Sequence, residues 1–173
     1  MTDYTQLYNE PPKVKRLHPD ATLPTRAHEH DAGWDLHALE HDQLQPGETR
    51  KIRTGIAVGV PVGQVGDVRS RSGLAARNII VANSPGTLDP GYTGEVKVLL
   101  ANRTHKRFVI NPGDRIAQLV FTYTNTRPIV EVDDLGDSDR GGGGFWVNRN
   151  LRPSASPTSC TGQADHKRRS TGG

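Results

Sequence analysis

Three short segments of the chain carry residue types that could hydrolyse a phosphate ester. The first places Asp35 inside an otherwise apolar stretch, and the second sets Arg71 and Ser72 just ahead of a possible short helix. The third is a turn-rich hairpin that presents Asp89 and Tyr92. A carboxylate can orient and deprotonate a water, while arginine and the amides at a helix start bind phosphate oxygens. Together the segments indicate hydrolysis of a nucleotide phosphate ester.

Each segment taken alone also has a purely structural interpretation. Asp35 could be an exposed strand-edge residue, and the loop 69–73 a solvated basic loop with an N-capping serine. Asp89 could simply form a turn with its own backbone. The glycine run 141–144 could be a linker. His28 and His30 flank Glu29, but without a third nearby ligand a surface loop is favoured over a metal site.

The elements that must position these residues are short strands. Apolar residues alternate over 56–60 and 96–100 and again at Phe108 and Ile110, which is typical of half-buried strands. The apolar run 116–121 predicts a strand buried on both faces. Pro-Gly and Gly-Asp pairs separate these stretches, and the one expected helix is brief, over 74–78. The pattern predicts an all-β fold, a jelly-roll-like β-barrel of short antiparallel strands with one short helix.

Composition divides the chain into four parts. We expect a flexible lead-in over 1–13, a β-barrel domain over 14–132, a flexible glycine-rich C-terminal arm over 133–148 and a disordered basic tail over 149–173. The tail holds five basic residues and one acid, a charge of +4. Since the net charge of the whole chain is +3, residues 1–148 carry about −1. Because residues 1–148 have no basic excess, the charge does not support binding of nucleic acid by the folded body. No apolar run suits a membrane span, and the single cysteine, Cys160, favours a cytoplasmic location.

The order and spacing of these segments resemble those of the trimeric dUTPase family. All five short motifs of that family can be matched between residues 32 and 146. The matching segments are Ala32–Leu36, Arg71–Ala75, Asn83–Glu95, Gly113–Leu119 and Arg140–Phe145. The resemblance implies a homotrimer with active sites at subunit interfaces that hydrolyses dUTP to dUMP and pyrophosphate with Mg²⁺. Such an enzyme keeps uracil out of DNA and supplies dUMP for thymidylate synthesis.

The resemblance also assigns roles to individual residues. Asp89 would activate the attacking water, and Asp35 would orient the water shell of a metal that has no direct protein ligand. Tyr92 would lie against the deoxyribose and leave no room for a 2′-hydroxyl. Asn83 and the hairpin backbone would read the uracil edge, and Phe145 would stack over it. The remaining substrate-binding residues implied are Arg71, Ser72 and Gly73, Gly86, Thr87 and Leu88, Lys97, Gln118, and Arg140 and Gly143 of the arm.

The chain departs from the family pattern at a few positions. Trp146-Val147-Asn148 stands where the family has small residues, Ser70 where proline is common, and Thr93 where arginine is frequent. Arg115 is expected to be structural. Two other functions stay open: a dCTP deaminase-related enzyme, and a non-catalytic trimeric protein that binds a regulatory partner through the same fold.

Overall fold

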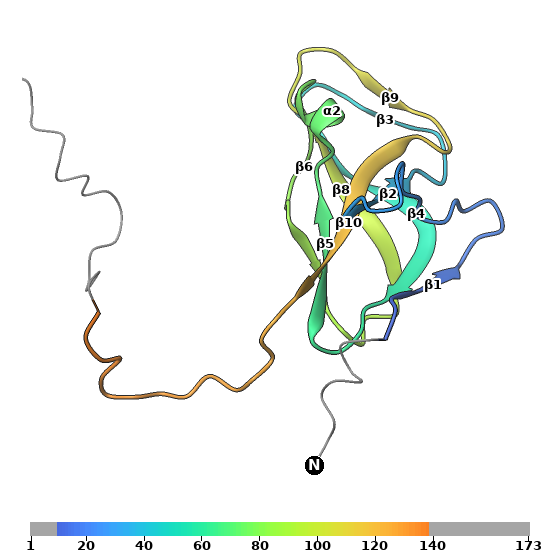
Figure 1. The fold of residues 1–173 in the computed structure, drawn as a ribbon. Coiled ribbons are helices and arrows are strands. Elements are labelled where there is room, and N and C mark those ends of the chain that lie inside the picture. Colours follow the sequence, from blue (N-terminus) through green and yellow to red (C-terminus); the bar gives the residue numbers. More distant parts are fainter. Residues whose placement is uncertain (1–9, 139–173) are drawn as a thin grey trace, which may run out of the picture. The chain divides into compact units, whose positions relative to one another are not determined.

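The computed structural model describes residues 10–138, and the regular secondary structure over them is almost all β-strand (Figure 1). The elements are β1 (Lys13–Arg16), β2 (Gly33–His37), β3 (Asp42–Leu44), β4 (Thr49–Gly59), β5 (Gln64–Arg69), α2 (Ser72–Ala75), β6 (Ile79–Val81), β7 (Gly86–Leu88), β8 (Glu95–Asn102), β9 (Phe108–Ile110) and β10 (Arg115–Tyr123). The expected Arg140, Gly143 and Phe145, and the tail, lie outside the described residues.

Every strand pair in this part of the chain is antiparallel. One four-stranded sheet has the order β1-β4-β8-β6, a second has the order β2-β10-β5-β7, and β3 pairs with β9 alone. Strands far apart in sequence are therefore neighbours, as a jelly roll requires. The all-β fold expected from the sequence is confirmed.

The hydrophobic core is built from side chains of both four-stranded sheets. Val98 and Ile52 come from one sheet and Leu36 and Leu119 from the other, and all are at most 1% exposed. The alternation expected over 96–100 is confirmed, since Val96, Val98 and Leu100 are all buried. Burying one such side chain contributes about 1.5–3 kcal/mol, so this shared cluster is what holds the two sheets together.

Two expectations about local structure were partly wrong. The strand over 116–121 buries Ile116 and Leu119, but Val120 and Phe121 are only half-buried. One face of β10 packs on the core. Phe121, near the end of this strand, lines an apolar cleft of about 550 Å³. The helix begins at Ser72 rather than Leu74, because the Arg71 carbonyl already accepts from the amides three and four residues later, at Leu74 and Ala75. Turns continue to Asn78, whose φ of 58° ends them.

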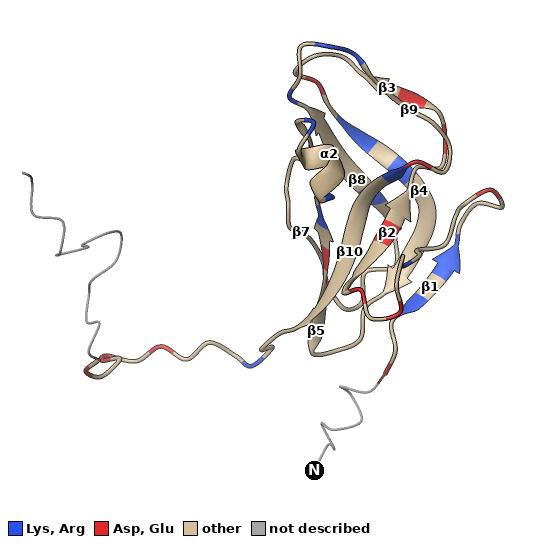
Figure 2. Ribbon diagram, turned by 45° about the horizontal axis from the view of Figure 1, so that its top comes forward, with Lys and Arg blue, Asp and Glu red and all other residues tan. Residues whose placement is uncertain are grey.

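The strand β1 closes one sheet with an edge of exposed basic side chains. Figure 2 shows this strand as largely basic, and its burial pattern is exposed throughout. Lysines on an edge strand disfavour pairing with strands of another chain. Of residues 10–138, none belongs to a helix long and apolar enough to cross a membrane. By compactness the chain divides into residues 1–128 and 129–173.

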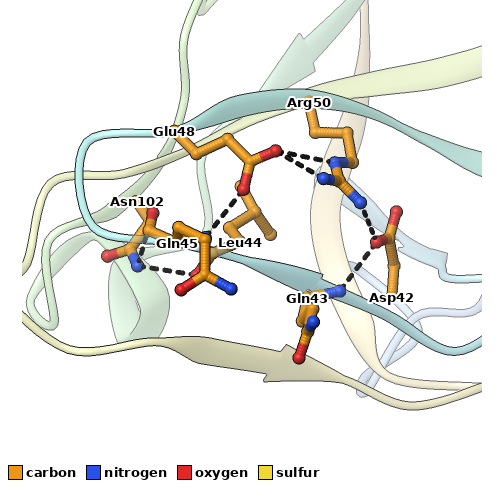
Figure 3. A network of polar contacts seen from close by, with 7 residues as sticks. All are labelled: Asp42, Gln43, Leu44, Gln45, Glu48, Arg50 and Asn102. Atoms are coloured by element: carbon orange, nitrogen blue, oxygen red, sulfur yellow. Dashed lines mark hydrogen bonds and ion pairs between the residues drawn. The ribbon is translucent and has the colours of Figure 1, made fainter.

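A polar network secures the end of the barrel that carries the β3–β9 pair (Figure 3). The Asn102 side chain is fully buried, and its amide donates to the carbonyls of Leu44, at 3.1 Å, and Lys106, at 2.7 Å. Arg50 links the carboxylates of Asp42 and Glu48 beside it. Since a buried amide must be hydrogen-bonded, Asn102 fixes the loops at this end.

Candidate functional site

A polar cleft of about 420 Å³ gathers the residues expected to hold phosphate. Its walls come from β2, from the loop between β5 and α2, and from β10. Asp35, Arg71, Ser72, Gly73 and Gln118 line it, as expected. Asp31 and Arg115 line it as well, although no binding role was predicted for either. This hollow is called the phosphate cleft below.

Asp35 is the charged centre of the phosphate cleft. Its carboxylate is 15% exposed and accepts from Arg71 Nε at 2.7 Å and from Arg115 Nη1 at 3.3 Å. Arg71 also donates through Nη1 to the carbonyl of Arg115, at 3.3 Å. Asp35 is therefore not an exposed edge residue, and Arg115 belongs to the cleft. One carboxylate orients two guanidinium groups, whose N–H donors suit an anion, while Asp31 brings the formal charge of the lining to balance.

Gln118 crosses the floor of the phosphate cleft. It lies opposite Asp35 on β2 and opposite Arg69 on β5, and its Nε2 donates to the Ser70 carbonyl at 2.9 Å. Gly33 makes this possible, because a Cβ there would stand 2.4 Å from the Gln118 Oε1. The amide is thus held by neighbouring strands and presented at a fixed place.

A second cleft, of about 440 Å³, lies along the hairpin that follows β6. Asp89, Tyr92 and Asn83 line it together with Thr87, Leu88 and Lys97, all expected from the sequence. Gly86 is buried in β7, and a Cβ on it would lie 2.8 Å from the Asn83 Nδ2. Glycine at 86 therefore makes the room that the Asn83 side chain occupies. This hollow is called the hairpin cleft below.

Tyr92 is folded back over its own hairpin. Its hydroxyl donates to the Glu95 carbonyl at 3.0 Å, and a Cβ on Gly94 would stand 2.6 Å from that hydroxyl. The Glu95 carboxylate, 13% exposed, accepts from Arg53 Nε at 3.2 Å and from the Gly55 amide at 2.9 Å. The hairpin that bears Tyr92 is thus tied to β4, which fixes the orientation of the ring.

Both clefts lie within the segment of the chain that matches a known protein family. The family model for dUTPase matches residues 19–146, which include both clefts. The chain belongs to the dUTPase family. Its match covers most of the chain, including every motif quoted from the sequence.

Curated relatives carry the family name over nearly the same span. The chain is 46% identical over 136 residues to a deoxyuridine 5′-triphosphate nucleotidohydrolase of Solibacter usitatus, covering 77% of this chain and 92% of that protein. It is 50% identical over 135 residues to one of Thermobifida fusca, covering 77% of this chain and 75% of that protein.

Solved dUTPase structures share the fold. A Staphylococcus bacteriophage 80alpha dUTPase mutant bound to dUpNHpp superposes with a TM-score of 0.73 and 29% identity, covering 78% of this chain and 96% of that one. A mutant dUTPase of phage phi11 of S. aureus, whose structure reveals coordination of a structural Mg(II) ion, has a TM-score of 0.69 at 27% identity, covering 74% and 100%.

Within the described part of this dUTPase-family chain, the expected site is divided. Asp35, Arg71 and Gln118 line the phosphate cleft, whereas Asp89 and Tyr92 line the hairpin cleft. Neither hollow contains both carboxylates that the sequence paired. The described residues therefore form two separate clefts.

Some site residues were missed by sequence reasoning. Glu95 and Lys51 line the hairpin cleft, and Asp31 the phosphate cleft. The carboxylate of Glu95 meets β4 about forty residues earlier in the chain, a contact without a local sequence signal. Asp31 closes the 28–31 turn, where the His28 amide donates to its carboxylate at 2.9 Å and lowers the pKa of that carboxyl. His28 Nδ1 also contacts Asp31 at 3.2 Å, on the surface loop that was favoured for it.

His37 stands behind the phosphate cleft at the end of β2. It is 8% exposed, and its Nδ1 is buried without a hydrogen-bond partner in the described part of the chain. Burial lowers the pKa of the His37 imidazole; Asp35 opposes this shift, and Arg115 and Arg71 add to it. A neutral imidazole at this position adds no charge to the Asp35 cluster.

Proposed function

We propose that this chain hydrolyses dUTP to dUMP and pyrophosphate, with Asp89 positioning the attacking water. Its membership of the dUTPase family supports this substrate. The observation that carries the mechanism is the pair of clefts: one in which Asp35 holds two arginines, and one along a hairpin that presents Asp89 beside Tyr92. An anion-binding wall and a water-directing carboxylate are the two parts that this reaction needs.

The phosphate cleft would hold the triphosphate. The substrate carries about four negative charges and the departing pyrophosphate gains more, so fixed cations stabilise the transition state. Arg71 and Arg115 supply that charge on the described wall, held in place by Asp35. Gln118 and the Ser72 hydroxyl would add neutral hydrogen bonds. Arg140 and Gly143 of the arm are proposed to close over the same phosphates, with Phe145 on the base.

The hairpin cleft would hold the deoxyuridine. Asp89 would accept a proton from water as its oxygen attacks the α-phosphorus and the bond to the bridging oxygen of pyrophosphate breaks. Tyr92, held through its hydroxyl, would set its ring against the sugar and exclude a 2′-hydroxyl. Asn83, in the room left by Gly86, would read the uracil edge with the backbone of 86–88.

Mg²⁺ fits the donors of the phosphate cleft. It prefers oxygen ligands and usually keeps several waters, and the carboxylates of Asp31 and Asp35 line the cleft. Both Asp35 oxygens already accept from arginine, which suits contact with the waters of a metal rather than with the metal itself. When bound, Mg²⁺ would neutralise charge on the triphosphate. The protein's own part is to hold Asp35 and its arginines in one orientation.

We further propose that the two clefts combine in a homotrimer. The segment after β10 exposes large apolar side chains, with Ile129 99% and Leu135 96% exposed. The apolar cleft beside β10 is lined by Trp34 and Phe121. Apolar surface of this kind normally marks an interface. Assembly would place the phosphate cleft of one copy against the hairpin cleft of another, with the arm of a third above them.

Pyrophosphate release tests this function directly. Purified protein is assayed with dUTP, dCTP, dTTP and UTP, with and without Mg²⁺, and ammonia release from dCTP is followed in parallel. We expect release from dUTP with Mg²⁺, and Asp89→Asn to lower kcat at least about a hundredfold while dUTP still binds, as for loss of a general base. Asp20→Asn, an acid with an 82% exposed side chain, is the control. Full turnover by Asp89→Asn, or deamination of dCTP, would overturn the proposal.

A further inference from the structure

Ser70 uses each of its polar groups to contact a different element. Its amide donates to Ser84 Oγ at 3.2 Å, its hydroxyl oxygen accepts from the Val81 amide at 2.9 Å, and its carbonyl accepts from Gln118 Nε2 at 2.9 Å. The residue lies between β5 and α2, directly before Arg71. One half-buried serine thus contacts β10, the end of β6 and the turn that follows β6.

These contacts join the two clefts. Gln118 and the neighbouring Arg71 line the phosphate cleft. Val81 and Ser84 enclose Asn83, which lines the hairpin cleft. The turn between them is itself closed, because the Ser84 amide donates to the Val81 carbonyl at 3.2 Å. Ser70 is therefore bonded on one side to the phosphate wall and on the other to the turn proposed to read uracil.

On each side of this connection, a cleft-lining side chain lies close against a glycine. Gln118 fills the space above Gly33, and Asn83 fills the space above Gly86, each so closely that a Cβ on the glycine would clash. A shift of the serine would reach Gln118 through its carbonyl, and the turn that carries Asn83 through its amide and hydroxyl.

The connection depends on serine at this position. Proline, which the family pattern favours there, has no amide hydrogen to donate to Ser84 and no hydroxyl for the Val81 amide. Alanine would keep the first contact and lose the second. The Val81 residue is buried, so its amide would be left without its acceptor.

We propose that Ser70 is a positioning residue that fixes the phosphate-binding loop to the uracil-reading turn. The inference rests on the proposed function, since it assigns that turn to base recognition. Because the proposed active site draws its clefts from different copies, displacement of Ser70 in one copy would disturb two sites of the assembly.

The test compares Ser70→Ala, Ser84→Ala, the double variant and Ser70→Thr, each in the full chain. Two quantities are measured: kcat/KM for dUTP, and the ratio of the competitive inhibition constants of dCMP and dUMP. The ratio does not depend on the fraction of active protein, so a merely structural loss leaves it unchanged. Thr104→Ala is the matched control, because its hydroxyl accepts from the Lys106 amide at 3.1 Å in a loop away from both clefts.

We expect Ser70→Ala to lower kcat/KM about tenfold and to reduce the dCMP/dUMP ratio several-fold, the size expected for one lost hydrogen bond. Ser84→Ala should lower kcat/KM and the dCMP/dUMP ratio about threefold. In the double variant the fold-loss of kcat/KM should be smaller than the product of the two single losses, because the bonds from Ser70 to Ser84 and Val81 hold the same turn. Ser70→Thr, which keeps the hydroxyl, and Thr104→Ala should stay within about twofold of the wild type.

An unchanged inhibition ratio in Ser70→Ala would overturn the inference, as would an equal change in Thr104→Ala. If Ser70→Ala does not fold, the exposed Ser84→Ala decides, and an unchanged ratio there has the same meaning. Failure of the proposed function looks different: the wild type would then release no pyrophosphate from dUTP.

Discussion

At the scale of single residues, the proposed contact of Tyr92 with the sugar gives a prediction about substrate choice. Its hydroxyl is bonded to the Glu95 carbonyl, and Gly94 leaves room for the ring. We predict that Tyr92→Ala raises kcat/KM for UTP relative to dUTP about tenfold or more, because the space for a ribose 2′-hydroxyl opens. Tyr92→Phe should have a smaller effect, since it keeps the ring and loses only the hydrogen bond to the Glu95 carbonyl. Equal UTP discrimination in wild type and Tyr92→Ala would contradict the role.

His37 gives a second residue-scale prediction, on pH. Burial lowers the pKa of its imidazole below the ordinary 6.5, so under acid conditions the unfolded chain binds a proton that the folded chain does not. The free energy of unfolding should therefore fall as pH drops below about 6.5 toward the folded pKa, and be unaffected above it. Urea denaturation at pH 7.5, 6.5 and 5.5 measures this. His37→Phe should flatten that slope, and identical slopes would contradict the assignment.

Residue identities in the clefts could be predicted from the sequence, but their partners could not. Asp35, Arg71 and Gln118 were expected together, and the structure places them in one cleft. The pairing of Arg115 with Asp35 was missed, because it joins residues eighty positions apart across two paired strands. Local composition does not encode which side chain will face which across a sheet.

At the scale of elements, alternation identified β8 and β9 because one face of each strand is buried. The three-residue β3 was not expected, since Asp42-Gln43-Leu44 has no apolar alternation and its pairing with β9 comes from the loops around Asn102. Long-range contacts override weak local preference in such short strands. Strand order likewise follows from the core shared by the sheets and not from any one segment.

Asn102 holds the end of the barrel that carries the β3–β9 pair, and its contribution to stability can be measured. Its side-chain amide donates to the carbonyls of Leu44 and Gln45 (Figure 3) and of Lys106, and its oxygen accepts from the Thr104 amide at 3.0 Å. We predict that Asn102→Ala lowers the free energy of unfolding by about 2–4 kcal/mol, because buried carbonyls lose their donor. Chemical denaturation measures the loss. Glu48→Gln, in the less buried part of the same network, should cost clearly less. Comparable losses in the two variants would contradict the importance of Asn102.

At the scale of the whole molecule, the division of the site between two clefts makes a prediction about mixed assemblies. Asp89→Asn damages only the hairpin cleft, and Arg71→Ala only the phosphate cleft. If each active site takes one cleft from each of two copies, equal mixing by co-refolding should regenerate intact sites. Random assembly pairs an undamaged phosphate cleft with an undamaged hairpin in about one quarter of sites, so the mixture should recover about a quarter of wild-type dUTP turnover. Each variant refolded alone should stay near its own low rate. Were the clefts to act within one chain, no mixture of these two variants could contain an intact site, and recovery would be absent.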